Sequence, residues 1–518
     1  MSEETHKLEA QRRANRDAVA ALGLHPYGSR AEGLITNDAA RALHSPEADA
    51  AHAAGSKEPG FTDPRPAAKV AGRVMLLRDN GKLIWLQLRD ATGDLQAAVS
   101  QRDCPEGFKL AKLTDLGDIL IVGGRVMKTK TGEVTIWADE VLPGAKSLAP
   151  PPAKHEGLHD VEIRYRQRYV DLWANPETLS VFEMRSKIVG RARRFLEGRG
   201  YVEVETPMLQ TLAGGAAARP FVTHMNALDI DLYMRIAPEL YLKRLLVGGL
   251  PRVFEINRNF RNEGLDKQHN PEFTMLEAYH AFGDVETVME MTESLVRDAA
   301  RTPGLERFGP PRESAAPGVL AFGDLTIDYN RPFRRVPYGE LFAKAYGFEM
   351  QDDAKARATL KAMRPNLAKA IDAMDAVLVV NELFEEKGES LLDPSVPTFI
   401  TDYPAAISPL TRPKRENPVL ADRADLFIAG MEIAPHYTEL NDPDVQEAKF
   451  REQLRGLDEG KSAEEQTFRT FDHDFIRALK VGMPPAGGMG LGIDRLVMLL
   501  TNQRTIRDVM LFPMMRPE

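Results

Sequence analysis

The residues best able to do chemistry are concentrated at positions 254–273, in the sequence FEINRNFRNEGLDKQHNPEF. Arg261 and Glu263 are two residues apart, so on a strand both side chains point to one face. A guanidinium can grip a phosphate through two parallel hydrogen bonds, and a carboxylate beside it can accept a hydrogen bond from an exocyclic amine. His269 and Phe273 offer planar faces for an adenine. The segment therefore indicates a nucleotide site, although a cross-strand salt bridge beside a turn would use the same pair.

A second candidate is the glycine-rich segment GGMGLGIDR at residues 487–495. Glycines permit close approach of a backbone to a ligand, and Arg495 opens the helix predicted to follow. The segment is neither a P-loop, because it lacks Gly-Lys-Ser/Thr, nor the dinucleotide fingerprint, which needs its own strand, turn and acidic residue. A tightly packed strand–helix turn with Arg495 at the surface is the alternative interpretation.

Carboxylates form a third group, in which Asp425, Glu432 and Glu439 are spaced seven residues apart and Glu239 and Glu277 lie upstream. Oxygen ligands without histidine or cysteine suit a hard cation, and Mg²⁺ typically binds one or two carboxylates together with substrate phosphates. Buried carboxylates would also suit a cationic substrate, whereas a solvated acidic face would serve neither purpose. No Ser/His/Asp or Cys/His signature is present, so a covalent nucleophile is not indicated.

The N-terminal part of the chain offers a different set of side chains, Arg73, Trp85, Gln96 and Glu133. An aromatic ring on the face of a barrel can stack a base, and amide or carboxylate side chains can bind the edge of that base. These residues would suit recognition of a nucleic-acid loop. For a lone Trp85, filling a core is the alternative role.

Five short strands would position this N-terminal set. Segments that alternate or run apolar between Gly, Asp, Asn or Thr-Gly turns are typical of strands, and they lie at residues 69–77, 82–90, 95–100, 118–127 and 133–141. Five strands in about 75 residues fit a small barrel such as the oligonucleotide-binding (OB) fold. Another small barrel or a sandwich would have a similar pattern.

The remaining 360-odd residues mix helix and strand signals without regular βαβ alternation, which predicts an α+β fold with an antiparallel sheet. Helices are expected at 182–199, 238–246 and 354–376. Strands are expected at 201–207, 228–236, 252–261, 272–282, 398–404 and 424–434, and a Gly-rich strand enters a helix at 487–501. Proline clusters at 59–66 and 150–152 divide the chain into three predicted domains: an N-terminal helix and linker at 1–60, the barrel at 61–149 and the α+β domain at 150–518.

Composition narrows the class of protein. The chain has 518 residues, of which 43% are hydrophobic and 28% charged, as in soluble globular proteins. Its single cysteine, Cys104, excludes a disulfide framework and a Cys-based zinc site. The apolar runs are too short to span a bilayer, and the polar first 20 residues lack the apolar core of a secretion signal. We therefore expect a cytoplasmic protein that contacts no membrane.

The formal net charge of −9 argues against indiscriminate nucleic-acid binding. A total charge does not exclude local basic patches, which could meet phosphates. Two such groups are Arg12, Arg13 and Arg16 in the predicted N-terminal helix, and Arg73, Arg78 and Lys82 in the predicted barrel.

Several long motifs, taken in order, resemble those of the class II lysyl-tRNA synthetases over essentially the full chain. Residues 164–177 (RYRQRYVDLWANPE), 260–273 (FRNE and HNPEF) and 488–495 (GMGLGIDR) resemble motifs 1, 2 and 3 of that class. More specific to the lysine family are GGAAARPF at 214–221, IAPELYLKRL at 236–245 and TNQRTIRDVMLFP at 501–513. The resemblance implies a six-stranded antiparallel catalytic sheet flanked by helices, a five-stranded N-terminal OB-fold barrel that binds the anticodon, and a homodimer built through motif 1.

The resemblance also implies a reaction. L-lysine and ATP would form lysyl-adenylate and pyrophosphate with Mg²⁺ as cofactor, and the lysyl group would then move to the terminal ribose of tRNA(Lys); neither DNA nor a membrane is a partner. By similarity, Arg261 would hold the α-phosphate and the lysine carboxylate, and Glu263 would recognise an adenine stacked between Phe273 and Arg495. His269 would contact the outer phosphates, with Arg495 near the γ-phosphate.

The other roles that the resemblance implies fall into three sets. Metal ligands would be Asp425 and Glu432. The lysine α-amino group would meet Glu239 and the backbone of Gly215, and the rest of the substrate would meet Glu277, Tyr279, Tyr437 and Glu439. The anticodon readers would be Arg73, Trp85, Gln96 and Glu133, with Trp85 standing where the family usually has a stacking Phe.

The sequence departs from the family pattern beside the expected substrate. The usual EIANGFSEL is EIAPHYTEL here, so Pro435 replaces an Asn and Tyr437 a Phe, while Met431 replaces an Arg and Asp425 a Glu. These changes motivate an alternative, a paralogue that activates a lysine analogue such as β-lysine or ornithine. A non-catalytic tRNA-binding regulator is a further alternative, and the retention of both Arg261 and Arg495 argues against it. A variant that lysylates a protein is disfavoured because such enzymes lack the barrel.

Overall fold

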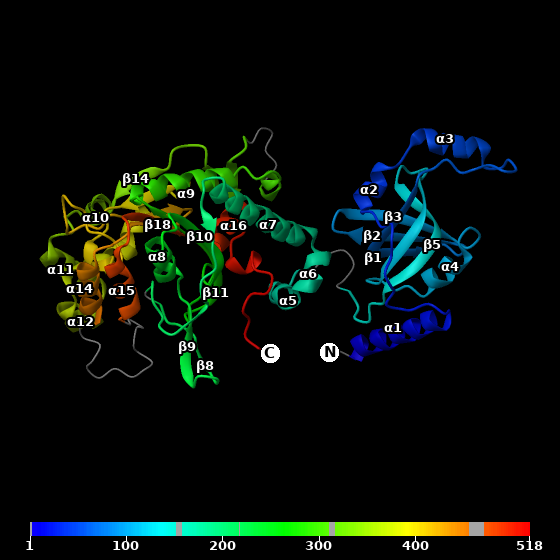
Figure 1. The fold of residues 1–518 in the computed structure, drawn as a ribbon. Helices are drawn as coiled ribbons and strands as arrows, with labels where there is room; N and C mark the ends of the chain where they lie inside the picture. The colour runs from blue at the N-terminus through cyan, green and yellow to red at the C-terminus, as the bar shows by residue number, and fades with distance from the viewer. Residues whose placement is uncertain (1–2, 152–157, 217, 310–315, 455–470, 518) are drawn as a thin grey trace. The chain divides into compact units, whose positions relative to one another are not determined.

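The structure of the protein is a computed structural model, and it describes residues 3–151, 158–216, 218–309, 316–454 and 471–517. The chain divides into two compact units, Met1–Leu179 and Ser180–Glu518 (Figure 1). The predicted domain boundary at 149/150 remains a prediction, since the short helices α5 (Val161–Arg166) and α6 (Arg168–Ala174) fall within the first unit by this division.

The first unit is built on a closed five-stranded barrel with strand order β1-β2-β3-β5-β4. Its strands are β1 (Ala67–Asp79), β2 (Leu83–Asp90), β3 (Gly93–Ser100), β4 (Ile119–Lys128) and β5 (Val134–Ala145). Alternate apolar residues point inward and are buried, as in the run Ile84, Leu86 and Leu88 of β2, because successive side chains of a strand face opposite sides. All five predicted strands and the predicted barrel are confirmed.

Four helices accompany the barrel. The predicted N-terminal helix is α1 (Glu3–Ala21), whereas α4 (Pro105–Lys112), between β3 and β4, was not predicted. The weakly patterned stretch at 37–54 forms α2 (Asn37–Ala42) and α3 (Pro46–Gly55). Their start signals are local, because the side chains of Thr36 and Ser45 accept hydrogen bonds from the first-turn backbone, which satisfies donors that a short helix leaves unpaired.

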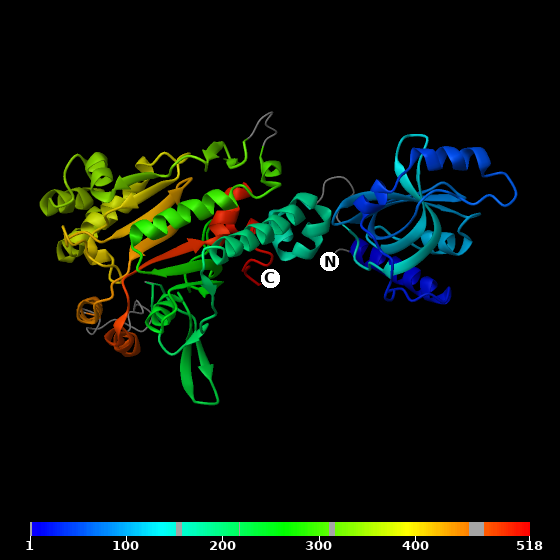
Figure 2. The ribbon, with the colours of Figure 1, turned by 45° about the horizontal axis from the view of Figure 1, so that its top comes forward.

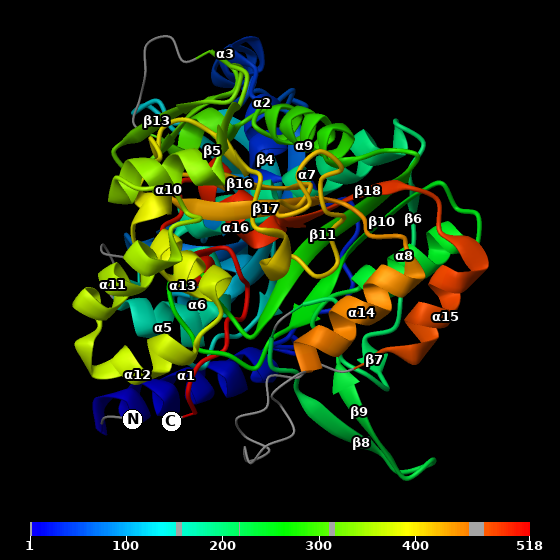
Figure 3. The ribbon, with the colours of Figure 1, turned by 90° about the vertical axis from the view of Figure 1, so that its left-hand side faces the viewer.

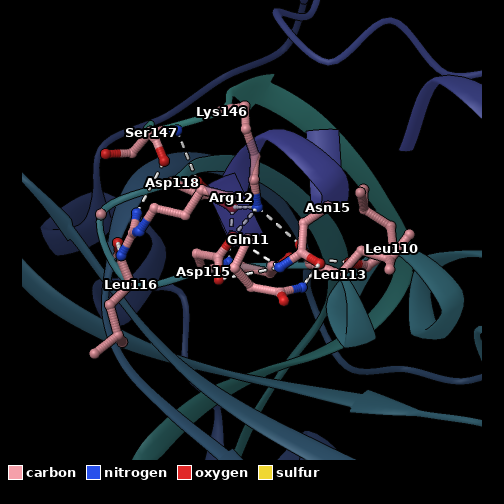
Figure 4. Close-up of polar contacts among 12 residues, drawn as sticks. Gln11, Arg12, Asn15, Leu110, Leu113, Asp115, Leu116, Asp118, Lys146 and Ser147 are labelled. Atoms are coloured by element: carbon pink, nitrogen blue, oxygen red, sulfur yellow. Dashed lines mark hydrogen bonds and ion pairs between the residues drawn. The ribbon is translucent and has the colours of Figure 1, made fainter. Parts of the chain in front are cut away.

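A buried polar cluster joins α1 to the barrel (Figure 4). Arg12 donates from its two Nη atoms to the carbonyl oxygens of Ser147 and Leu116, at 2.9 Å each, and is 7% exposed. Lys146 Nζ lies 2.6 Å from Asp115 and 2.7 Å from Asp118. The expectation that Arg12 meets phosphates is therefore wrong: its guanidinium fixes the helix. The neighbouring basic residues of α1 pair locally, Arg13 with Glu9 and Arg16 with Asp17.

The second unit is built on an eight-stranded sheet of order β14-β15-β16-β17-β18-β11-β10-β6. Six neighbouring strands, from β15 to β10, are antiparallel, so the predicted six-stranded antiparallel sheet is present. A parallel strand is added at each edge, β14 beside β15 and β6 beside β10. The strands are β6 (Val202–Glu203), β10 (Arg252–Phe260), β11 (Glu272–Ala281), β14 (Arg334–Pro337), β15 (Thr398–Thr401), β16 (Arg423–Ile428), β17 (Met431–Thr438) and β18 (Ala486–Gly492).

One predicted strand, at 424–434, is in fact a hairpin. Strands β16 and β17 pair antiparallel around Ala429 and Gly430, which have φ angles of 54° and 74°. Two consecutive residues with positive φ are the mark of the tight turn that suits the twist of a hairpin. The prediction failed because an Ala at the first of these positions is an unusual turn signal.

Helices cover both faces of the sheet (Figures 2 and 3). On one face, α7 (Pro176–Glu197), α9 (Val285–Ala299) and α16 (Ile493–Leu500) bury apolar side chains against the strands in a single core cluster. On the other face, α8 (Glu239–Val247), α14 (Pro443–Leu454) and α15 (His473–Gly482) pack together against Val253 and Tyr279. This second face also carries the candidate site, so α8 lies beside it while α7, α9 and α16 support the sheet from behind.

The remaining elements complete the second unit. The predicted helix at 354–376 is broken at Pro365 into α11 (Asp353–Met363) and α12 (Ala368–Ala373), because proline disfavours a helical conformation of the residue before it. Also present are α10 (Tyr338–Tyr346), α13 (Ala376–Leu383), the pair β12 (Val319–Phe322) and β13 (Leu325–Asp328), and the three strands β7 (Leu209–Gln210), β8 (Val222–Met225) and β9 (Ile230–Met234). Within the described ranges no helix is both long and apolar enough to cross a membrane.

Replacing Lys146 with Met should destabilise the first unit by about 3–5 kcal/mol, because removal of one partner leaves buried carboxylates without their cation. All three tryptophans, Trp85, Trp137 and Trp173, lie in this unit, so urea unfolding followed by tryptophan fluorescence measures its stability alone. The matched control is Lys109→Met, which breaks only an exposed pair with Glu106 and should cost less than about 1 kcal/mol. Equal losses for the two variants would contradict the role given to Lys146.

Candidate active site

Strand pairing brings most of the predicted site residues onto one face of the large sheet. Tyr279 pairs with Gly488, Gly488 with Tyr437, and Tyr437 with Arg423, a row that crosses β11, β18, β17 and β16. The next row contains Glu277, which pairs with Gly490. Since side chains two residues apart on a strand share a face, the sequence segments around 277, 437 and 488 contribute to one surface.

Glycine at position 488 is required by the side chains that lie over the β18 backbone. A Cβ atom placed there would overlap both the carboxylate of Glu439 and the ring of Tyr279. A Cβ at Gly490 would stand 3.8 Å from atoms of both Glu277 and Pro435. The glycine-rich segment therefore lets side chains of neighbouring elements pack directly on the β18 backbone, and its approach to a ligand stays a prediction.

Three carboxylates are buried around this floor. Glu239, at the start of α8, and Glu277 on β11 are each 6% exposed, and Glu439, just after β17, is fully buried. The backbone of Gly215 lies beside Glu239, since a Cβ at Gly215 would be 3.2 Å from the Cβ of Glu239. Burying carboxylates is costly unless they are paired with cations, so the pocket is built for positive charge.

A lysine of the protein itself occupies the centre of this carboxylate group. Lys243, on α8, is fully buried; its Nζ donates to Glu239 Oε1 at 2.7 Å and forms an ion pair with Glu439 Oε2. Sequence reasoning missed Lys243, although the spacing of four residues from Glu239 on a predicted helix was a usable signal.

Electrostatics reflect the crowding of negative charge. The pKa of Glu277 is raised to about 8 by its burial and by the charge of Glu239, partly opposed by a hydrogen bond from Tyr279 Oη at 3.2 Å. Burial also raises the pKa of Glu439, and the ion pair with Lys243 opposes that shift. Burial and the three carboxylates likewise raise the pKa of Tyr279. Without a further cation, the folded pocket therefore tends to hold protons.

The nucleotide candidates lie toward the end of β10 and around the loop that follows. The guanidinium carbon of Arg261 stands 5.2 Å from the centre of the Phe273 ring, and among the described residues its Nε has no hydrogen-bond partner. Arg495 donates from Nη2 to His269 Nε2 at 2.9 Å and from Nη1 to the Glu432 carbonyl at 2.6 Å. The structure thus brings together His269 and Arg495, which the sequence separates by more than 200 residues.

Two of the predicted nucleotide contacts differ in their surroundings. His269 is exposed and its Nδ1 lies 2.7 Å from Asp266, which orients the ring toward Arg495. Glu263 is exposed in the loop between β10 and β11, where its backbone N–H donates to the Arg261 carbonyl at 2.9 Å. The side chain of Glu263 is thus open to a ligand.

The predicted metal ligands lie on the neighbouring strands β16 and β17. Asp425 is buried and accepts two hydrogen bonds from Arg423, from Nε at 3.1 Å and from Nη2 at 2.6 Å. Glu432 is accessible to solvent, and partial desolvation together with the charge of Asp425 raises its pKa. Glu389, which sequence reasoning missed, has its pKa raised to about 7 by burial and by the charges of Glu432, Glu385 and Asp425.

The substituted residues beside these carboxylates lie on β17. Pro435 pairs with Asp425 across β16 and β17, and its Cγ lies 3.8 Å from where a Cβ of Gly490 would stand. Tyr437 stands 5.7 Å from the guanidinium of Arg423, measured to its ring centre. His436 points to the opposite face, where it bonds to the Ala424 carbonyl and to Thr292, so it belongs to the core.

The barrel carries a separate surface of predicted nucleic-acid contacts. Trp85 is half-buried on the outer face, and Gln96 accepts a hydrogen bond from Thr135 at 2.8 Å. Trp85 pairs with Ala98, and Ala98 with Trp137, so the register places a second indole on the same face, which sequence reasoning missed. Glu133 is exposed at the turn before β5.

Arg73 makes contacts within the first unit instead of standing free on the outer face. Its guanidinium donates to the Gly117 carbonyl at 2.7 Å and stacks 4.8 Å from the ring centre of Trp173. Burial lowers its pKa. These contacts engage Arg73 within the protein, at a distance of five residues along β1 from Arg78, the partner of Trp85.

Comparison with known proteins finds relatives for both the large-sheet unit and the barrel. The sequence matches the family of tRNA synthetases class II (D, K and N) over residues 160–516, and the OB-fold nucleic acid binding domain over residues 68–143. It is 45% identical to the lysine–tRNA ligase of Pelotomaculum thermopropionicum over 98% of this chain and 94% of that protein. It is 44% identical to that of Magnetococcus marinus over 100% and 98%, and 46% identical to that of Escherichia coli over 86% of each.

The raised pKa of Glu277 predicts a pH dependence of stability. An unfolded carboxyl ionises near 4.5, so between that pH and about 8 the folded protein alone keeps the proton. The stability that Glu277 contributes is therefore complete below the unfolded value and is lost as the pH rises through the folded one, by at most about 1.4 kcal/mol per pH unit. Glu277→Gln should flatten the fall in unfolding free energy between about pH 5 and 8, measured by circular dichroism in urea. Glu263→Gln, at an exposed carboxylate, should retain the wild-type slope, and parallel curves for all three proteins would contradict the prediction.

Proposed function

Since the chain belongs to the class II tRNA synthetases and is a lysine–tRNA ligase, we propose that its buried carboxylates select lysine, that the Arg261 and Arg495 region binds ATP, and that the barrel reads the anticodon. The ligase reaction consumes ATP, lysine and tRNA. The observation that carries the proposal is the burial of Glu239, Glu277 and Glu439 on the same sheet face as Arg261.

The proposed lysine pocket pairs each ammonium group with buried oxygen atoms. Glu239 and the backbone of Gly215 would hold the α-ammonium, while Glu277, Glu439 and the hydroxyl of Tyr279 would hold the ε-ammonium. Tyr437, one strand further along the row, would line the pocket. A substrate without the distal ammonium would leave two carboxylates buried and unpaired, which gives strong discrimination without an editing step.

In the proposed activation step the lysine carboxylate attacks the α-phosphorus of ATP, and the bond from that phosphorus to the departing pyrophosphate breaks. The nucleophile is already ionised, so the protein needs to align the groups and to stabilise charge rather than supply a base. Arg261 would hold the attacking carboxylate and the α-phosphate together. Its unpaired Nε and its place at the end of β10 support this role.

The adenine and the outer phosphates have separate proposed contacts. Phe273 and Arg495 would stack on either side of the base, and Glu263, open to solvent in its loop, would accept a hydrogen bond from the exocyclic amine. His269 and Arg495, which lie within hydrogen-bonding distance, would turn toward the β- and γ-phosphates. Their present mutual contact supports a shared position near the pyrophosphate.

The donors present fit a magnesium ion bound together with ATP. Asp425 and Glu432 lie on adjacent strands, and the effect of Asp425 on the Glu432 pKa indicates an excess of negative charge between them. Within the parts of the chain that the structure describes, no cluster of three or more His, Cys, Asp or Glu side chains could hold a metal by itself, so substrate phosphates and water would complete the coordination. When bound, the ion would neutralise charge on the pyrophosphate.

Pro435 alters how the substrate carboxylate is held. Proline has neither a side-chain donor nor a backbone N–H, so this carboxylate would depend on Arg261 alone. Because the distal carboxylates are retained, we propose that lysine remains the substrate and that Pro435 weakens its binding rather than changing its identity.

For the tRNA, we propose that Trp85 stacks an anticodon base and that Gln96 and Glu133 bind base edges. The outward face of Trp85 and the nearby amide of Gln96 support this assignment. Arg73 is left out of the proposed set because its guanidinium is held by Gly117 and Trp173.

We also propose a homodimer built through motif 1 and a cytoplasmic location. Exposed apolar side chains in that segment and just before it support the dimer, with Tyr169 at 65% and Val161 at 55% exposure. Two observations support the cytoplasmic location: the reaction uses tRNA, a substrate of protein synthesis, and the cysteine Cys104 is a free, buried thiol.

Replacing Arg261 with Ala should lower lysine-dependent ATP–pyrophosphate exchange by at least about 100-fold, because no other group would hold both reacting partners. Affinity for tRNA should change little. The matched control, Arg258→Ala, removes an exposed arginine of the same strand, which pairs with Glu272, and should keep most of the exchange rate. Loss of exchange in both variants, or in neither, would count against the assignment.

Replacing Trp85 with Ala should raise the KM for tRNA by roughly 5- to 150-fold, since one base stack contributes about 1–3 kcal/mol. Lysine-dependent exchange without tRNA should stay at the wild-type rate. Tyr27→Ala, at an exposed aromatic residue of the same unit, serves as the control in the aminoacylation assay. If Trp85→Ala slowed both reactions equally, the division of labour between the two units would be wrong.

A further inference from the structure

The lysine pocket already contains a lysine side chain. Lys243 is fully buried, and it touches two of the three carboxylates that the proposed function gives to the substrate. An internal ion pair of this kind could simply fasten α8 to the segment after β17. Its position among substrate ligands points to a further role.

Lys243 contacts only one of the two oxygen atoms of each carboxylate. Lys243 takes Oε1 of Glu239 and Oε2 of Glu439. The second oxygen of Glu239 faces Gly215, at 3.8 Å from where a Cβ of that residue would stand. The second oxygen of Glu439 lies over Gly488, is buried, and has no hydrogen-bond partner among the described residues. Each carboxylate thus has one oxygen paired with Lys243 and a second oxygen that Lys243 does not hold.

The charges of these groups also match those of free lysine. Once bound ammonium groups keep Glu239, Glu277 and Glu439 ionised, these three carboxylates and the protonated Lys243 carry a net charge of −2. Burial lowers the pKa of Lys243, but its two carboxylate partners outweigh that effect, so its pKa is raised and it stays charged. Free lysine brings two ammonium groups, and its carboxylate is taken by Arg261 in the proposed function.

Other cations near these carboxylates are committed elsewhere. Arg235, which lowers the pKa of Glu277 from a distance, is bound to Glu255 at 2.7 Å. Arg412 acts on Glu439 only as a more distant charge. Among the described residues, Lys243 is the cation that pairs directly with Glu239 and Glu439.

We propose that Lys243 is a positioning residue for lysine recognition: it fixes Glu239 and Glu439 so that each presents one free oxygen, and it leaves the pocket with a charge equal and opposite to that of the two substrate ammonium groups. This inference rests on the proposed function, because it takes the three carboxylates as substrate ligands. Lys243 itself touches neither lysine nor ATP in this scheme and acts through Glu239 and Glu439.

The first test is Lys243→Met, which keeps the length of the side chain and removes its charge. Steady-state pyrophosphate exchange should show the KM for lysine raised by at least about tenfold, with the KM for ATP within about twofold of wild type. Preference for lysine over ornithine, as a ratio of kcat/KM, should fall because Glu439 is no longer held in place. A purely structural role would move all the kinetic constants together, or only the melting temperature.

The matched control is Lys449→Met on α14. Lys449 is also partly buried in the second unit, but it donates to the carbonyl oxygens of Ala405 and Ser408 rather than to carboxylates. The Lys449→Met variant should leave the KM for lysine within about twofold of wild type. Folding of each variant is checked by circular dichroism and thermal unfolding.

A second variant guards against misfolding of the first. Lys243→Met combined with Glu439→Gln removes one charge of each sign, so the net charge of the ionised group stays at −2 and only Glu239 loses its ion-pair partner. Its KM for lysine should be lower than the product of the two single effects predicts, as expected when two residues are coupled. Multiplicative effects, an unchanged KM for lysine in folded Lys243→Met, or failure of both variants to fold would each overturn the proposal.

The pocket and the role of Lys243 can fail separately. If Glu239→Gln and Glu277→Gln leave the KM for lysine unchanged, the proposed substrate pocket is wrong, whatever the Lys243 variants do. If those two variants raise the KM and folded Lys243→Met does not, the pocket stands and only the role of Lys243 is lost.

Discussion

Three carboxylates buried close together on one face of the large sheet repel each other. The arrangement of the charged groups in the second unit depends on how this repulsion is offset. Glu239, Glu277 and Glu439 come from a helix, a strand and the segment after another strand, and none could stay ionised in an apolar interior by itself. The structure resolves the conflict in part with Lys243 and leaves the rest of the negative charge unpaired. In the proposed function a cationic amino acid would pair with these carboxylates, so the interactions that destabilise the free protein would contribute to the affinity for the substrate.

The sheet makes this arrangement possible because its two faces do different work. Behind it, α7, α9 and α16 bury a continuous apolar cluster that includes Phe254, Leu276 and Leu491. These residues alternate along β10, β11 and β18 with Glu255, Glu277 and Gly490 on the opposite face. Because each strand is fixed by its apolar residues in the core, the neighbouring residues on the opposite face, including Glu255 and Glu277, are held at fixed distances from one another. The bare backbone of β18 provides room for Glu439 and Tyr279, which no larger residue at position 488 would allow.

Much of this could be predicted from the sequence, and the failures share a physical cause. Strand alternation gave the barrel and the six antiparallel strands, and long motifs gave Arg261, Glu277 and Arg495. What periodicity does not encode is which charged groups pair across the fold. Arg12 was expected at the surface and instead caps carbonyl groups of the barrel; Arg73 was expected among the anticodon readers and is engaged by Gly117 and Trp173. Lys243 and Arg423 were missed for the same reason, since an exposed and a buried cation look alike in one dimension. The hairpin at Ala429 and Gly430 was missed because its turn lacks the usual residue at the first position.

The substitutions on β17 acquire a physical meaning from these pairings. Asp425 has a shorter side chain than the usual Glu. Two hydrogen bonds from Arg423 fix the orientation of its carboxylate. Pro435 pairs with Asp425; in the proposed function it would remove one donor to the substrate carboxylate and leave the oxygens proposed to bind the ammonium groups unchanged. Recognition of lysine by charge is therefore separable from alignment of its carboxylate for attack. In the proposed function, a loss at Pro435 would fall on the alignment step, where Arg261 would act alone, while the three carboxylates and Lys243 would still set the identity of the substrate.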